Sequence, residues 1–274
     1  MSLWACSRHL SKLDFDVLIN LHPNERCSFI DAMTSVKLRT GTTHKIFKWF
    51  WDVFTPLDRS MHAADMYLDV LQQLGVQDLS NNGLEIFPGE EHFLEAELFW
   101  QEQNITDQDK LIGFNIGSAV PTKRWPPERF AEVADIFAAK GYKTVFFGGP
   151  MDEEMVAEAT GYMQTRPIIA TGHFAIGGLA AAMRRCCLII TNDSGPMHVA
   201  ISQKVPIVAM YGPSNPKLYG PYTKDAVIVT AQPPCQGCAD GMKHSCDDLQ
   251  CMSRMTVKQV VEAADTMLER GVEK

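Results

Sequence analysis

In the second half of the chain, short apolar runs alternate with single helical patterns, and this alternation limits the fold more than any other feature. Six runs of four or five residues are rich in β-branched, aromatic and other apolar side chains. Short continuous apolar strands that alternate with helices are typical of a parallel sheet covered on both faces. The sequence therefore predicts a doubly wound α/β domain. Its strands are expected at 111–115, 144–147, 167–170, 187–191, 206–210 and 226–229, and its helices at 127–140, 152–163, 176–185 and 196–203.

The first hundred residues predict part of a second α/β domain. Strands are expected at 16–21, 36–41 and 84–87, and helices at 62–74 and 92–103. Two or three strands cannot make a well-covered sheet by themselves, so this domain is expected to be incomplete. The polar segment 104–109 marks the boundary. The predicted domains are a partial Rossmann-like domain over 1–105 and a Rossmann-like ligand-binding domain over 106–274.

Composition disfavours several functional classes. The 274 residues include 25 Lys and Arg against 33 Asp and Glu, a net charge of −8 with no basic run, which disfavours nucleic-acid binding. No apolar stretch approaches the roughly 20 residues of a membrane-spanning helix, and the first residues lack the order of a secretory signal. The expected location is therefore cytoplasmic. Dinucleotide, phosphate-loop and zincin motifs are missing from the sequence, which disfavours dehydrogenases, ATPases and metalloproteases.

Four glycine-containing loops follow the predicted strands of the second half, at 117–126, 148–150, 192–198 and 211–216. The carboxyl ends of parallel strands meet at one edge of the sheet, where ligands bind in α/β proteins. We therefore expect these loops to form one ligand site, with backbone close to the ligand.

The loop 192–198 carries the most specific chemistry of the four. Ser194 or Gly195 can cap the helix that follows, and Pro196 suits its first turn, so the helix start can bind phosphate. Asp193 can hold sugar hydroxyls, and His198 can hydrogen-bond a phosphate oxygen. The alternative is a well-capped helix with a carboxylate favoured by the helix dipole.

Two other loops offer further groups. Ser118 supplies a hydroxyl, and Lys123 can neutralise the charge that a diphosphate gains as it departs, although a solvated lysine before a helix is the alternative. Gly149 can approach a nucleotide, or it can belong to a plain strand-to-helix turn with acidic first-turn residues.

Four cysteines crowd into one short stretch, at Cys235, Cys238, Cys246 and Cys251. They can form a four-thiolate structural site for zinc or an iron–sulfur cluster. The alternatives are reduced thiols and a single disulfide, because only the first pair has metal-binding spacing.

Together, the motifs KRWPPERF (123–130), FGGP (147–150), NDSGPMHVA (192–200) and YGPSNP (211–216) resemble glycosyltransferase family 9, the ADP-heptose:lipopolysaccharide heptosyltransferases. The resemblance extends from about residue 14 to the end of the chain. It implies a GT-B fold, in which two Rossmann-like domains face a cleft, with the acceptor on the N-terminal side and the nucleotide-sugar donor on the C-terminal side.

The same resemblance implies an inverting, metal-independent reaction that requires no cofactor. The donor would be ADP-heptose and the acceptor a lipid-linked saccharide of the lipopolysaccharide core, at the inner face of the inner membrane with at most peripheral contact. Lys123 and Ser118 would contact the donor phosphates, and Asp193 would lie against the sugar. The turn Ser194–Gly195–Pro196 and His198 would hold the diphosphate. Lys123 and Asp193 are the expected catalytic residues.

One departure from the family pattern concerns the general base. Family members begin with a strand and a Gly-Asp turn, whose aspartate is expected to accept the proton of the acceptor hydroxyl. Nothing similar precedes Asp14 in this sequence. The alternative function is therefore a catalytically impaired nucleotide-sugar-binding protein derived from that family.

Overall fold

The protein divides into two compact units in a computed structural model. The structure describes the chain except for residues 1, 23, 43–44, 57, 59, 232–245, 247 and 273–274. Unit 1 comprises Met1–Asn81 and unit 2 comprises Asn82–Lys274. Among the described residues, no helix has both the length and the apolar composition needed to cross a bilayer.

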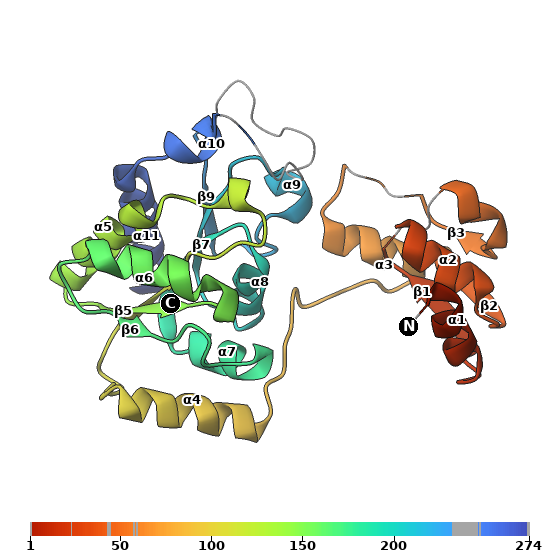
Figure 1. Cartoon of the computed structure of the whole chain (residues 1–274), viewed down its shortest axis with the longest axis horizontal. Coiled ribbons are helices and arrows are strands. Elements are labelled where there is room, and N and C mark those ends of the chain that lie inside the picture. Colours follow the sequence, from red (N-terminus) through yellow and green to blue (C-terminus); the bar gives the residue numbers. More distant parts are fainter. Residues whose placement is uncertain are drawn as a thin grey trace. The chain divides into compact units, whose positions relative to one another are not determined.

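Unit 2 contains a six-stranded sheet in which every neighbouring pair is parallel (Figure 1). The six strands predicted from the sequence are confirmed, each within one residue at either end. The sheet order is β6-β5-β4-β7-β8-β9. The strands are β4 (Leu111–Asn115), β5 (Lys143–Phe147), β6 (Ile168–Ile169), β7 (Cys186–Asn192), β8 (Ile207–Met210) and β9 (Ala226–Val229).

The strand order reverses between β4 and β7. The chain runs outward from β4 to β6, then returns past β4 and continues outward in the other direction from β7 to β9. At such a switch point, the loops that leave the two central strands diverge to opposite faces of the sheet and leave a crevice. The loops after β4 and β7 therefore border the expected ligand site.

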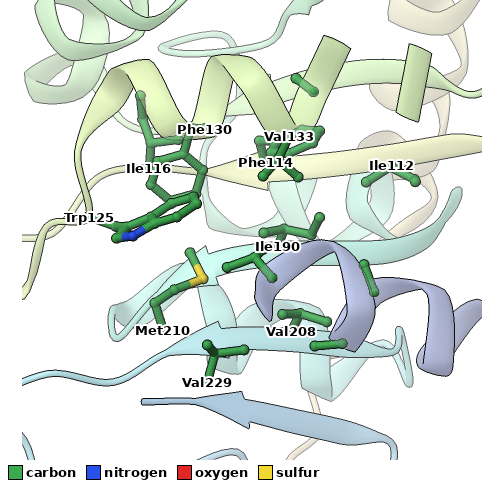
Figure 2. Packing of buried hydrophobic residues seen from close by; sticks show 14 of the residues in the cluster. Ile112, Phe114, Ile116, Trp125, Phe130, Val133, Ile190, Val208, Met210 and Val229 are labelled. Atoms are coloured by element: carbon green, nitrogen blue, oxygen red, sulfur yellow. The ribbon is translucent and has the colours of Figure 1, made fainter. Parts of the chain in front are cut away.

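Two apolar layers cover the sheet of unit 2, and the side chains of each strand alternate between them. Ile112 and Phe114 of β4 pack in the first layer, whereas Leu111 packs in the second. Figure 2 shows Ile190, Val208 and the other labelled strand residues of the first layer on one face of the sheet. The first layer includes buried residues of α5 (Pro127–Ala139), α6 (Glu153–Tyr162) and α11 (Val257–Val272); the second includes those of α4 (Glu90–Glu102), α7 (Ile176–Met183) and α8 (Gly195–Ser202).

The strand expected in the segment before β4 is absent. Residues 84–87 form no strand, because side chains rather than a strand ladder bind this segment: Gln203 Nε2 donates to the Ile86 carbonyl (2.8 Å). The helix expected at 92–103, observed as α4, packs on α7, and its Phe99 and Trp100 are buried in the second layer. The division into compact units falls between residues 81 and 82, so α4 is part of unit 2.

Unit 1 contains a three-stranded parallel sheet in the order β1-β2-β3. The predicted strands at 16–21 and 36–41 are observed as β1 and β2, and the predicted helix at 62–74 as α3, whose cap His62 accepts from the Ala64 amide (3.1 Å). No pattern in the sequence predicted α1, α2, η1 or β3. The elements are α1 (Leu3–Ser11), β1 (Val17–Asn20), α2 (Glu25–Met33), β2 (Leu38–Gly41), η1 (Lys45–Phe50), β3 (Val53–Phe54) and α3 (Ala63–Gln73).

A half-buried carboxylate lies beside β1 in unit 1. Asp31 of α2 accepts a hydrogen bond from Asn20 Nδ2 at the end of β1 (2.5 Å). Burial raises the pKa of Asp31 from 3.8 to about 6, although the Asn20 hydrogen bond and the charge of Arg39 act in the opposite direction.

A matched pair of Gly→Ala substitutions tests the packing of unit 2. A Cβ at Gly113 in β4 would overlap the side chains of Ile189 and Phe147, so Gly113→Ala is expected to lower the free energy of unfolding by about 1–3 kcal/mol. Gly161 in α6 has open space around its missing Cβ, so Gly161→Ala is expected to raise that free energy by up to about 1 kcal/mol. Urea unfolding measures both, and equal effects would contradict the packing described for β4.

The raised pKa of Asp31 predicts that the stability of unit 1 depends on pH. A carboxyl with a higher pKa in the folded than in the unfolded chain binds its proton more tightly when folded, so stability falls as the pH rises from about 4 to about 6. Wild-type β1 and β2 amides should be better protected from hydrogen exchange at pH 4.5 than at pH 7, after correction for intrinsic rates. Asp31→Asn should remove this difference but leave the protection of β4 in unit 2 unchanged. A pH difference that persists in the variant would contradict the assignment to Asp31.

Candidate functional site

Buried polar side chains gather at the switch point of the unit 2 sheet. They come from the ends of β4 and β7 and from the loops that follow β4, β7 and β8, and none is more than 7% exposed. Burying a polar group is costly unless the group is hydrogen-bonded, so such a cluster requires a connected network. Its members are Asn115, Ser118, Thr191, Asn192, Asp193 and Ser214.

Two asparagines tie the strands and loops of this network together. Asn115 at the end of β4 donates from Nδ2 to Thr191 Oγ1 (3.1 Å) and to Ser194 Oγ (2.8 Å). Asn192 at the end of β7 donates to the Ile116 carbonyl (2.7 Å) and accepts from the Trp125 amide (3.1 Å). Asn192 therefore closes the loop between residues 116 and 125 at both of its ends.

Trp125 anchors the far end of the same loop. Its side chain is fully buried beside Phe130 and Ile116, as Figure 2 shows, and its indole N–H donates to the Met255 carbonyl (3.1 Å). A side chain of this size contributes a large buried apolar area, so the end of the loop is fixed to the core.

Lys123 and Asp193 form a buried ion pair within the network. Lys123 ends the short helix η2 (Pro121–Lys123), and its Nζ lies 2.7 Å from Asp193 Oδ2, with the two side chains only 16% and 8% exposed. Ser214 Oγ donates to the same carboxylate oxygen at 2.5 Å. The carboxylate thus has two partners, which compensate for the loss of solvation on burial. The alternative of a solvated surface lysine is wrong for Lys123.

Ser118 joins the same loop to the strand end. Its hydroxyl lies 3.3 Å from the Asp193 carbonyl oxygen, to which it donates, and its own carbonyl accepts from Arg124 Nε (2.8 Å). The structure therefore brings Ser118, Lys123 and Asp193 together, although they are up to 75 residues apart in sequence.

The start of α8 lies beside this pair. Ser194 is the N-cap residue, but its hydroxyl makes no capping hydrogen bond to the helix and instead accepts from Asn115. Gly195 is exposed, and a Cβ there would meet no atom within 4 Å. Pro196 occupies the first turn, and His198 is half-buried within α8. The helix start is therefore open to a ligand and carries the partial positive charge that favours an anion.

Gly149 lies in a turn whose inner space is filled by the carboxylate of Asp152. Asp152, at the end of η3 (Pro150–Asp152), accepts from the Gly149 amide (2.9 Å), and its carboxylate fills the space beside Gly117. This geometry is that of the strand-to-helix turn given as the alternative for this segment.

The cysteine cluster is only partly described. Cys235 and Cys238 lie outside the described residues, whereas Cys246 is exposed and Cys251 is buried. In the part of the chain that the structure describes, no three His, Cys, Asp or Glu side chains are arranged to hold a metal ion.

Sequence reasoning missed three groups in the site: Asn115, Asn192 and Ser214. Both asparagines end apolar strands, where a polar residue is a usable signal for the edge of a sheet. Ser214 lies in one of the glycine-containing loops, but no spacing rule connects it to Asp193, which is 21 residues away.

The assembled groups suit a ligand with an anionic part and a hydroxylated part. Lys123 and the open start of α8 provide positive charge for phosphate oxygens. Asp193, whose carboxylate contacts the same lysine, provides a hydrogen-bond acceptor for hydroxyl groups of the ligand.

Comparison with known proteins gives consistent results. A model of glycosyltransferase family 9 (heptosyltransferase) matches residues 3–246. Lipooligosaccharide heptosyltransferase 2 of Haemophilus ducreyi is 34% identical over 139 residues, which are 48% of this chain and 40% of that protein. The lipopolysaccharide core heptosyltransferase OpsX of Haemophilus influenzae is 25% identical over 233 residues, 81% of this chain and 63% of that protein. The matches to these relatives thus span less than two thirds of their length.

Solved structures show the same fold. A glycosyl transferase family 9 structure from Veillonella parvula superposes with a TM-score of 0.89 at 51% identity, over 98% of this chain and 78% of that one. E. coli ADP-heptose lps heptosyltransferase II superposes with a TM-score of 0.74 at 21% identity, over 98% and 81%. The α/β architecture is therefore that of the GT-B heptosyltransferases. With a family model that matches most of its length, the chain belongs to glycosyltransferase family 9, the heptosyltransferases.

Proposed function

We propose that the protein is a glycosyltransferase that moves a heptose from ADP-heptose to the lipopolysaccharide core or a related glycan, with inversion and without a metal ion. The observation that carries this proposal is the buried Lys123–Asp193 pair beside the open start of α8, at the switch point of a family 9 fold. The relatives named above act in lipopolysaccharide or lipooligosaccharide synthesis by their names, which supports the acceptor class.

In the proposed reaction, an acceptor hydroxyl oxygen forms a bond to the anomeric carbon of the heptose. The bond from that carbon to the diphosphate breaks, ADP leaves with the electron pair, and the proton of the acceptor hydroxyl passes to water. Lys123 and the amides at the start of α8 stabilise the charge that develops on the diphosphate. Asp193 accepts hydrogen bonds from the sugar hydroxyls, while Ser118, Ser194, Gly195, Pro196 and His198 border the phosphates.

The proposed acceptor is lipid-linked, so the enzyme would work in the cytoplasm at the inner face of the inner membrane. It would hold the saccharide part of the acceptor and touch the membrane only peripherally.

A lysine substitution tests the donor site. Lys123→Met is expected to weaken ADP-heptose binding at least about tenfold, because a charge-assisted contact to phosphate is lost. The variant also leaves a buried carboxylate without its cation, so its free energy of unfolding should fall by about 3 kcal/mol. Titration calorimetry and urea unfolding measure the two effects.

Two further variants separate binding from stability. In Lys123→Met/Asp193→Asn both charges are removed, so most of the stability should return while binding stays weak. Lys140→Met removes a surface pair with Asp265 and should leave both quantities nearly unchanged. Unaltered ADP-heptose affinity in both Lys123 variants would exclude the proposed site.

Turnover distinguishes the enzyme from a binding protein. ADP release from ADP-heptose is expected to depend on added lipopolysaccharide-core acceptor and to persist in excess EDTA. ADP release is measured by a coupled assay, with heptose transfer confirmed by mass spectrometry of the acceptor. Tight donor binding without acceptor-dependent release would favour the catalytically impaired nucleotide-sugar-binding protein.

A further inference from the structure

Ser214 contacts the carboxylate on which the proposed donor site depends. It lies in the loop between β8 and α9 (Pro216–Tyr219), and its side chain is completely buried. Its hydroxyl donates to Asp193 Oδ2, the same oxygen that Lys123 Nζ contacts at 2.7 Å. Lys123 and Ser214 therefore share one acceptor atom.

The loop that carries Ser214 is fixed at several points. Asn215 caps α9 by accepting from the Lys217 amide (3.0 Å), and the Tyr211 hydroxyl donates to the Tyr219 carbonyl (2.7 Å). Gly212 lies so close to Met252 that a Cβ there would overlap its sulfur atom. These contacts hold Ser214 against Asp193 independently of Lys123.

Tyr211 is a third buried side chain close to Asp193. Burial, and after it the nearby Asp193, raises the pKa of the Tyr211 phenol above its usual range. The phenol therefore stays neutral and keeps its hydrogen bond to Tyr219.

We propose that Ser214 is a positioning residue that holds Asp193 in place when Lys123 turns from the carboxylate to the donor diphosphate. This inference rests on the proposed function. A lysine that binds phosphate gives up part of its interaction with Asp193, and a buried carboxylate without a partner is costly. The Ser214 hydrogen bond remains in that state, so Asp193 stays oriented toward the sugar. ADP carries no heptose for Asp193 to contact, so the orientation that Ser214 maintains affects the binding of ADP-heptose and not that of ADP.

Binding of ADP-heptose and of ADP alone tests this role. Ser214→Ala is expected to weaken ADP-heptose binding about tenfold, the loss typical of a hydrogen bond to a charged group, and to leave ADP binding within about twofold. Ser214→Thr keeps the hydroxyl and should restore ADP-heptose binding to within about threefold. Ser202→Ala removes another buried serine hydroxyl, which bonds the Val199 carbonyl in α8, and should change neither affinity.

A double variant shows whether Ser214 acts through Asp193. If it does, Ser214→Ala/Asp193→Ala binds ADP-heptose no more weakly than Asp193→Ala alone, because without an acceptor at position 193 the contact is already lost. Equal losses for ADP and ADP-heptose, additive losses in the double variant, or no rescue by threonine would each overturn the inference but leave the proposed function standing. Failure of the wild-type protein to bind ADP-heptose would overturn both.

Discussion

A carboxylate buried at the switch point of the sheet is the constraint to which the rest of the site is fitted. Asp193 is at most 8% exposed, so it requires a cation and a hydrogen-bond donor close by. Lys123 meets the first requirement only because Asn192 and Trp125 hold its loop at both ends. Ser214 meets the second because the loop after β8 is tied to α9. The strand order of the sheet brings these segments to one edge, so fold and site are consequences of the same arrangement.

The fold of unit 2 was predictable because its strands are covered on both faces. Such strands are continuous apolar runs, and all six were located within one residue. Residues 84–87 also contain apolar side chains, but this segment forms no strand ladder and its Ile86 carbonyl accepts instead from the distant Gln203, a partner that no local pattern reveals. The apolar residues of α4 indicated a helix; they could not indicate on which unit it packs. In unit 1, β3 is only two residues long, too short for a periodic signal.

The candidate site was predictable to the extent that it follows from strand ends. The site residues that the sequence predicts after β4 and β7 lie at the edge formed by the carboxyl ends of the strands, and Lys123 contacts Asp193 there. The sequence could not show whether these side chains are buried and paired or exposed to solvent. A lysine before a helix is usually solvated, whereas this one is paired and mostly buried, because a segment 70 residues later in the chain supplies its partner. Ser214 was not predicted for the same reason, because its hydrogen-bond partner Asp193 follows a different strand.

The double hydrogen bond of Asn192 also separates two kinds of sequence change. Because this one side chain holds both the Ile116 carbonyl and the Trp125 amide, the ends of the loop keep their positions whatever lies between them. Substitutions at its exposed residues Ala119 and Pro121 should alter the surface beside the site while the sheet and its core stay intact. Substitutions at Asn192 or Trp125 release the whole loop. The loop thus presents exposed positions from a frame that is fixed at both ends, so substitutions there can change the surface beside the site without refolding the domain.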